Sequence, residues 1–175
     1  AGRVPASGPV LLVANHHNSI IDSMAILAVS PRAAGPMAKA PLWKMAALRP
    51  FLEAVEAVPV FRPQDAAEND GRGARANLET FAECIRRLQA GRSVVLFPEG
   101  TRQSGPVITE MFDGPAWLAA RAQVPILPVG IGGSEKMMGK GAIAILPGVP
   151  EKPRNGDVLY HYRPDSAFFY LTGFA

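Results

Sequence analysis

The sequence has little of several features that mark other classes of protein. It holds one cysteine, Cys84, in 175 residues, which excludes an intramolecular disulfide framework and a multi-cysteine zinc site. Its net charge of +3 is too small to favour nucleic acid as a partner. No apolar run approaches the ~18–20 residues of a membrane-spanning helix. With 48% hydrophobic residues, the chain is expected to form a compact domain with a buried core.

Short apolar segments alternate with segments of helical periodicity. The expected strands cover residues 9–14, 36–38, 57–61, 93–97 and 124–131. The expected helices cover residues 19–29, 41–56 with an interruption around Pro50, a stretch through Leu78, Phe81, Ile85 and Leu88 that stops at Gly91, and residues 114–123. This alternation predicts an α/β fold with a mostly parallel central sheet flanked by helices.

Polar motifs follow three of the expected strands. Residues 15–22 come after the first strand, Arg62 follows the third, and residues 99–102 follow the fourth. Functional sites of parallel α/β sheets gather at the carboxyl ends of the strands. We therefore expect these motifs to converge on one site.

His17 and Asp22 are the leading candidates for catalysis within the first motif. A neutral imidazole can take a proton from an attacking hydroxyl, and a nearby carboxylate fixes its tautomer. Asp22 could instead complete a capping box with Ser19, leaving His17 as an ordinary loop residue. The spacing alone leaves both interpretations open. A metal site is disfavoured because the next histidine, His161, lies far along the chain.

The motif after the fourth strand combines a carboxylate, a flexible turn, a hydroxyl and a guanidinium. Thr101 and Arg102 suit phosphate oxygens, because the guanidinium is a forked donor and the hydroxyl adds another. Glu99 could pair with an arginine or bind a substrate hydroxyl, or the whole motif could be a turn with a surface ion pair. Arg62 has the same ambiguity. The sequence contains neither a P-loop nor the Gly-x-Ser-x-Gly motif of serine hydrolases.

Taken in order, four blocks of the sequence resemble those of the glycerolipid acyltransferase family, which includes the lysophosphatidate acyltransferases. The blocks are HNSIID at 17–22, VPVFR at 58–62, FPEGTR at 97–102 and VPILPV at 124–129. Each block alone is weak to moderate evidence, but four in the right order form a specific pattern. The resemblance covers roughly residues 8 to 140.

The resemblance implies transfer of a fatty acyl group from acyl-CoA or acyl-carrier protein to 1-acylglycerol 3-phosphate or a related glycerol-phosphate hydroxyl. It implies that His17 is the general base and that Asp22 orients it. The residues that would hold the acceptor are Arg62, Glu99, Gly100, Thr101 and Arg102. No metal or cofactor is implied, because the acyl thioester is itself a substrate. The implied location is peripheral, on the cytoplasmic face of a membrane. Because the sequence opens with Ala rather than Met, we expect it to begin inside a longer protein.

Two positions depart from the family pattern. The doublet His16–His17 leaves a second register open, because some relatives carry five residues between histidine and aspartate, which would make His16 the base. His17 is preferred because Ser19 falls where the four-residue form places serine. Glu56 stands where the second block usually opens with glycine, so the turn before Arg62 is in question.

The last segment of the sequence resembles a different family. Residues 142–147 and 163–174 are similar to the opening of the N-terminal domain of X-Pro aminopeptidases, and no peptidase catalytic residue can be carried over. The expected organisation is an acyltransferase domain over residues 1–138 and this second segment over residues 139–175. The alternative function is that of a truncated or chimaeric domain that only binds lipid or acyl-CoA.

Overall fold

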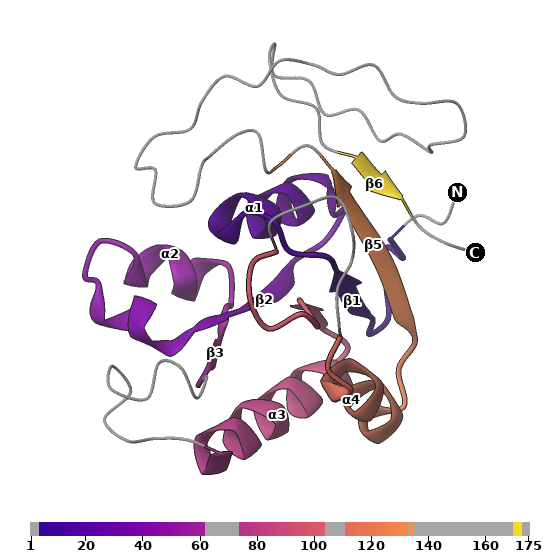
Figure 1. Cartoon of the computed structure of the whole chain (residues 1–175). Coiled ribbons are helices and arrows are strands. Elements are labelled where there is room, and N and C mark those ends of the chain that lie inside the picture. Colours follow the sequence, from indigo (N-terminus) through magenta and orange to yellow (C-terminus); the bar gives the residue numbers. More distant parts are fainter. Residues whose placement is uncertain (1–3, 62–73, 104–110, 133, 135–169, 173–175) are drawn as a thin grey trace.

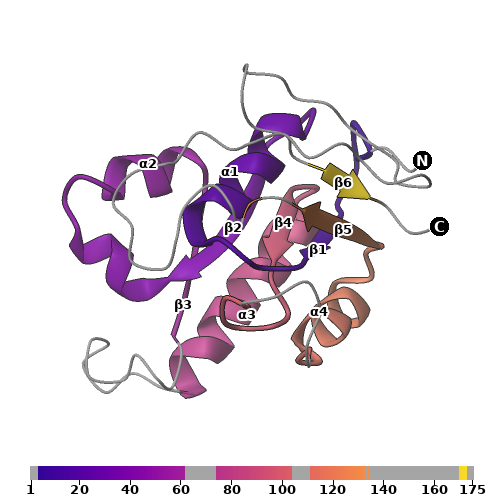
Figure 2. The same cartoon turned by 45° about the horizontal axis from the view of Figure 1, so that its top comes forward.

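A six-stranded sheet forms the centre of the computed structural model, which describes residues 4–61, 74–103, 111–132, 134 and 170–172 (Figure 1). The strands are β1 (Leu11–Ala14), β2 (Ala34–Lys39), β3 (Val58–Val60), β4 (Ser93–Leu96), β5 (Ile126–Gly132) and β6 (Tyr170–Thr172). Their order across the sheet is β3-β2-β4-β1-β5-β6. The first five strands run parallel, and β6 pairs antiparallel with β5 at one edge (Figure 2). The predicted α/β fold with a mostly parallel sheet is confirmed.

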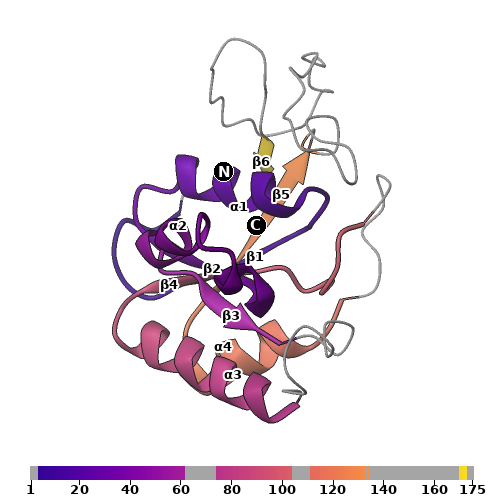
Figure 3. The ribbon, with the colours of Figure 1, turned by 90° about the vertical axis from the view of Figure 1, so that its left-hand side faces the viewer.

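The helices lie on both faces of this sheet. They are α1 (Ser19–Val29), the 3-10 helix η1 (Ala40–Lys44), α2 (Arg49–Ala54), α3 (Ala74–Gln89) and α4 (Gly114–Ala122). Helix α1 covers one face, and α3 and α4 cover the other (Figure 3). None of the helices in the described part of the chain is long and apolar enough to cross a membrane.

Successive side chains of β1 point to opposite faces of the sheet and contribute to the hydrophobic core on each face. Leu12 packs in a cluster with Ile26 of α1, whereas its neighbour Leu11 packs with Leu88 of α3 and Leu118 of α4. Both leucines of β1 are fully buried, as expected for a parallel strand covered on two sides. The continuous apolar runs in the sequence therefore follow from burial of both faces.

Cys84 lies in the cluster beneath α3 and α4 and is fully buried. Burial disfavours the thiolate and raises the pKa of the Cys84 thiol to about 11. The predicted apolar stripe on α3 is shorter than expected, because Leu78 at its start is 66% exposed.

The segment predicted as one helix over residues 41–56 is divided differently from the expectation. It forms η1 and α2, and the break covers residues 45–48 rather than Pro50. Pro50 lies in the first turn of α2, where an amide hydrogen would have no helical partner in any case.

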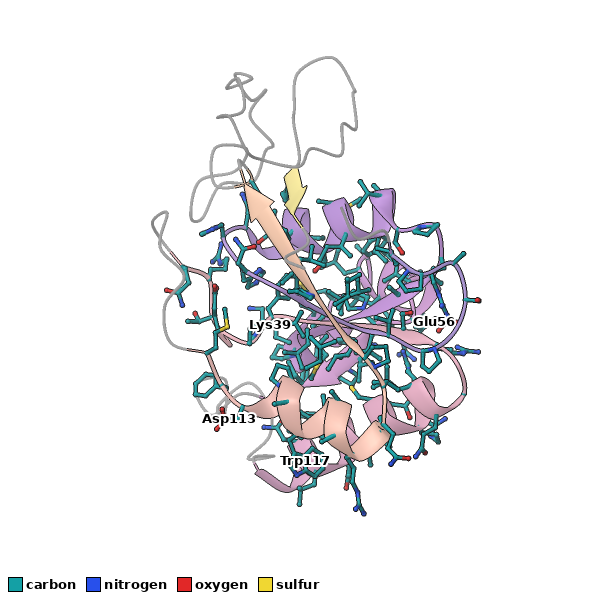
Figure 4. All side chains as sticks on the ribbon, turned by 90° about the vertical axis from the view of Figure 1, so that its right-hand side faces the viewer. Lys39, Glu56, Asp113 and Trp117 are labelled. Carbon is teal, nitrogen blue, oxygen red and sulfur yellow. The ribbon has the colours of Figure 1, made fainter. Side chains whose placement is uncertain are left out.

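The turn that enters β3 forms despite the absence of glycine at position 56. Glu56 adopts φ of 54°, the left-handed conformation that glycine takes without strain. Its carbonyl accepts a hydrogen bond from Arg87, and its carboxylate contacts Arg92 at 2.5 Å. In Figure 4 Glu56 lies at the side of the sheet opposite Lys39, the last residue of β2.

Candidate active site

The loop between β1 and α1 is folded around the carboxylate of Asp22. Oδ2 of Asp22 accepts the backbone N–H of His17 at 2.8 Å and that of Asn18 at 2.6 Å. Asp22 is fully buried in the first turn of α1, where backbone N–H groups and the helix dipole favour an anion. The helix cap is Asn18, with no side-chain cap hydrogen bond, and Asp22 accepts the N–H of this residue, so the expected capping box that starts at Ser19 is wrong.

The histidine ring beside this carboxylate is that of His16. Its Nδ1 lies 2.9 Å from Oδ2 of Asp22, and its ring stacks on Phe97 with 4.2 Å between the centroids. The side chain of His16 keeps 15% of its surface exposed, so it remains accessible from solvent.

His17 contributes its backbone to Asp22 rather than its ring. Nδ1 of His17 is buried and has no hydrogen-bond partner among the described residues. The expected side-chain pair of His17 and Asp22 is therefore corrected to a pair of His16 and Asp22. The physical reason is that the N–H groups of residues 17 and 18 wrap around the carboxylate, which leaves residue 16 as the one whose ring reaches it.

The segment after β4 lies directly against His16. Glu99 is 3% exposed, and its Oε2 accepts the backbone N–H of His16 at 3.1 Å. The N–H of Gln103 donates to the carbonyl of His16 at 2.8 Å. Burial raises the pKa of the Glu99 carboxyl, and the hydrogen bond from the His16 backbone partly offsets this effect.

Gly100 turns the chain at this point with φ of 64°. A Cβ atom there would lie 2.9 Å from the ring of Phe112, an exposed side chain that can move aside, so the backbone conformation is what favours glycine. Thr101 and Arg102 follow and are exposed. Arg62, the remaining predicted acceptor-binding residue, lies outside the described residues.

Two residues at this site had no assigned role in the sequence. The side chain of Asn15 bonds both backbone groups of Ile131, accepting from N–H at 2.6 Å and donating to C=O at 2.8 Å. It thereby ties the end of β1 to β5. Phe97 supplies the ring on which His16 stacks. The available signal for Asn15 was a polar side chain placed directly after a buried strand.

Within the described ranges, no group of three or more His, Cys, Asp or Glu side chains could hold a metal ion. An imidazole in contact with a carboxylate, as His16 is with Asp22, is an arrangement that can transfer protons.

The sequence pattern of the acyltransferase family matches residues 2–132. The chain belongs to the acyltransferase family. The crystal structure of the 1-acyl-sn-glycerophosphate (LPA) acyltransferase PlsC from Thermotoga maritima has the same fold. It superposes with a TM-score of 0.63 at 24% identity, covering 79% of this chain and 51% of that one.

Two curated plant proteins of this acyltransferase family are similar over a shorter stretch. The chloroplastic 1-acyl-sn-glycerol-3-phosphate acyltransferases BAT2 of Brassica napus and LPAT1 of Arabidopsis thaliana are each 32% identical over 72 residues. These alignments cover 41% of this chain and 21% and 20% of the two plant proteins. The chain thus matches about a fifth of the length of these relatives and about half of the bacterial structure.

A second family pattern matches the end of this acyltransferase-family chain. The N-terminal domain of aminopeptidase P matches residues 134–175, in agreement with the resemblance seen in the sequence. Of this segment the structure describes residue 134 and β6. The domain boundary after residue 138 stays a prediction.

Proposed function

We propose that the chain is the acyltransferase domain of a 1-acylglycerol-3-phosphate O-acyltransferase of phospholipid synthesis. It transfers a fatty acyl group from acyl-CoA or acyl-carrier protein to the free hydroxyl of 1-acylglycerol 3-phosphate or a related glycerol phosphate. The family match and the activities named for the relatives support this proposal. The observation that carries it is the contact between His16 and Asp22 at the carboxyl end of β1.

In the proposed reaction His16, rather than His17, is the general base. Asp22 accepts two backbone N–H groups through Oδ2, which is the behaviour of an ionised carboxylate. The third donor to this oxygen is then Nδ1–H of His16, and this tautomer leaves the lone pair on Nε2. Nε2 takes the proton of the acceptor hydroxyl while the hydroxyl oxygen attacks the thioester carbonyl.

The collapse of the tetrahedral intermediate completes the transfer. The new ester C–O bond is kept, the C–S bond breaks, and the proton held by His16 passes to the departing thiolate. Asp22 stabilises the imidazolium that exists between these two proton transfers. The acyl group and the proton are both accounted for without a cofactor or metal.

Thr101 and Arg102 are proposed to hold the phosphate of the acceptor. Both side chains are exposed and follow Glu99 directly in sequence. A guanidinium and a hydroxyl are suitable donors to phosphate oxygens. Gly100 provides the turn between Glu99 and these two donors. Arg62 is proposed as a further cation that binds the acceptor phosphate.

The domain is proposed to act at the cytoplasmic face of a membrane as a peripheral protein. Its acceptor and its product are both lipids, so the site must meet a lipid surface. Phe112, which lies beside Gly100, is 69% exposed, and the adjacent Met111 is 46% exposed. Exposed apolar side chains of this kind beside the site are suited to contact with the interface of a bilayer.

The experiment that tests this function measures thiol release from palmitoyl-CoA in the presence of 1-acylglycerol 3-phosphate or glycerol 3-phosphate. We expect release that depends on the acceptor, and a loss of kcat of about 100-fold or more in His16→Ala. His17→Ala is the matched control, and we expect its kcat to stay within a few-fold of the parent. Palmitoyl-acyl-carrier protein, used in parallel, identifies the donor.

Two outcomes would contradict the proposal in different ways. Loss of activity in His17→Ala alone would show that His17 is the base, with four residues between the base and Asp22. Binding of palmitoyl-CoA without any acceptor-dependent release, by a chain with a native circular dichroism spectrum, would support the domain that only binds lipid or acyl-CoA.

A further inference from the structure

The segment from Phe97 to Gln103 contacts His16 in three different ways. Phe97 stacks on the imidazole ring, Glu99 accepts the backbone N–H, and the N–H of Gln103 donates to the backbone carbonyl. Asp22 holds the remaining side of the ring through Nδ1. Both the main chain and the side chain of His16 are therefore held by residues at least 81 positions away in sequence. Asp22 is the one partner that lies close to it in sequence.

The resemblance placed Glu99 among the residues that hold the acceptor, but its surroundings fit a different task. Its side chain is buried at 3% exposure, whereas Thr101 and Arg102 are exposed. Oε2 is already engaged by the N–H of His16. An ionised carboxylate is also a poor neighbour for a phosphate, because like charges repel.

We propose that Glu99 is a positioning residue that fixes the main chain of His16, rather than a ligand of the acceptor. This inference rests on the proposed function, because it concerns the histidine that acts there as base. With Glu99 in place, the N–H of His16 has a fixed acceptor and the ring is held between Phe97 and Asp22. Without it, this partly buried N–H loses its partner and the loop can shift.

The kinetic prediction separates positioning from binding. In Glu99→Ala we expect kcat to fall about 10- to 100-fold, because small displacements of a catalytic group have effects of this size, while KM for the acceptor stays within about threefold. Glu99→Gln keeps a side-chain carbonyl that can accept the same hydrogen bond. We expect this conservative variant to recover most of kcat.

A second measurement observes the contact without using activity. Amide hydrogen exchange, followed by NMR in the whole chain, reports whether the N–H of His16 has lost its acceptor. We expect exchange at His16 to be about tenfold faster in Glu99→Ala. If Glu99→Ala does not fold, Glu99→Gln still moves the His16 amide proton resonance, because an amide replaces a carboxylate as acceptor.

The matched control is Glu83→Gln on α3. Glu83 is a partly buried glutamate whose carboxylate pairs with Arg87 at 2.6 Å, on the helix layer rather than at the site. We expect it to leave kcat and the resonance of the His16 amide unchanged. A general effect of removing a carboxylate would appear equally in this control and would overturn the assignment.

The outcomes distinguish the positioning role of Glu99 from the catalytic role of His16. A rise in acceptor KM of tenfold or more in Glu99→Ala, with unchanged kcat and unchanged exchange at His16, would overturn the positioning role and restore acceptor binding. Full activity of His16→Ala would instead overturn the assignment of His16 as the base, while the exchange experiment would still report on the contact between Glu99 and His16.

Discussion

At the amino ends of the parallel strands arginine side chains donate to backbone carbonyls, whereas at the carboxyl ends acidic and amide side chains accept from backbone N–H groups. Arg32, just before β2, bonds the carbonyl of Gly91 at 2.7 Å and also that of Gly8. Arg87 bonds the carbonyl of Glu56. Figure 4 shows the two ends on opposite sides, with Glu56 at one and Lys39 and Asp113 toward the other.

The chemistry of helix ends explains this division. In a parallel α/β fold each helix ends near the amino end of the next strand, and its last carbonyls need donors. Each helix begins near the carboxyl end of the preceding strand, where free N–H groups need acceptors. Arg87 donates to the carbonyl of Glu56 just after α2, Arg92 donates to the carboxylate of the same residue, and Asp22 meets the second need at α1.

The two ends also differ in how completely their buried polar atoms are paired. At the carboxyl end Oδ1 of Asp22, Oε1 of Glu99 and Nδ1 of His17 are buried and without a partner in the part of the chain that the structure describes. At the amino end only Oγ of Ser93 has this character among the described residues. Unpaired buried groups lower stability. The carboxyl end, which holds the proposed site, is therefore expected to lower the stability of the fold more than the amino end does.

The largest effect on stability is expected at the amino end, at Gly35 in β2. A Cβ atom there would overlap with the carbonyl oxygen of Glu56 and approach Nη1 of Arg87 at 3.1 Å. Gly35→Ala should therefore lower the free energy of unfolding by about 3 kcal/mol, measured by urea denaturation. Gly91→Ala is the control, because nothing lies within 4 Å of its Cβ position and only its φ of 80° causes strain. An equal or larger loss in Gly91→Ala would contradict this crowding.

At the carboxyl end, Asn15→Ala should change both stability and activity. It leaves the N–H and C=O of Ile131 without their side-chain partner, at a cost of about 2 kcal/mol in the free energy of unfolding. We expect kcat to fall as well, because Asn15 precedes His16. Ser93→Ala, which removes a buried hydroxyl without a partner, should leave both quantities nearly unchanged. A destabilised Asn15→Ala with full kcat would show that the tie to β5 does not position the loop.

The pH dependence of stability gives a third contrast, through Glu99. Burial raises the pKa of its carboxyl above the ordinary value of 4.5, so the folded chain binds this proton more tightly than the unfolded chain. The cost of the buried charge is absent below about pH 4.5 and grows as the pH rises through the raised pKa. Glu99→Gln should therefore gain stability relative to the parent as the pH rises above about 4.5. A relative loss as the pH rises above about 4.5, measured by denaturant titration, would refute the sign of the shift in pKa.

The smallest effect is expected for Glu56→Gly. It relieves the left-handed strain at φ of 54°, about 1 kcal/mol, and removes the exposed pair with Arg92, which contributes between about 0 and 1 kcal/mol. We expect a net gain of about 0.5 kcal/mol in thermal or urea unfolding, with kcat unchanged. Glu56→Gln keeps the strain and loses the charge, so it should show no gain. A clear loss in Glu56→Gly would mean that the contacts of the glutamate outweigh its conformation.

The arrangement of the sheet could be predicted from sequence because its signals are local. Continuous apolar runs indicated strands buried on both faces, and the polar motifs after them indicated one shared edge. The identity of the histidine beside Asp22 could not be predicted, because spacings of four and five residues both bring an imidazole within reach. The choice depends on main-chain N–H groups wrapping around the carboxylate, which residue types do not encode.

The role of Glu99 and the turn at Glu56 depend on contacts distant in sequence. Glu99 is buried against a residue 83 positions away, so its motif alone could not separate acceptor binding from positioning. Glu56 takes a conformation typical of glycine, with Arg87 and Arg92 donating to it across 31 and 36 positions. Local pattern therefore predicted a departure from the family at this turn, and tertiary contacts explain how the turn still forms.

The burial of Cys84 has a practical consequence for assays that count released thiol. The only sulfhydryl of the chain is on α3, buried in the core and held protonated, so a thiol reagent reacts with released coenzyme in preference to the folded protein. Once α3 separates from the sheet, each molecule exposes one equivalent that reacts readily. We therefore expect the rate at which the reagent labels the resting protein to report how often α3 separates from the sheet, in the same assay that follows turnover.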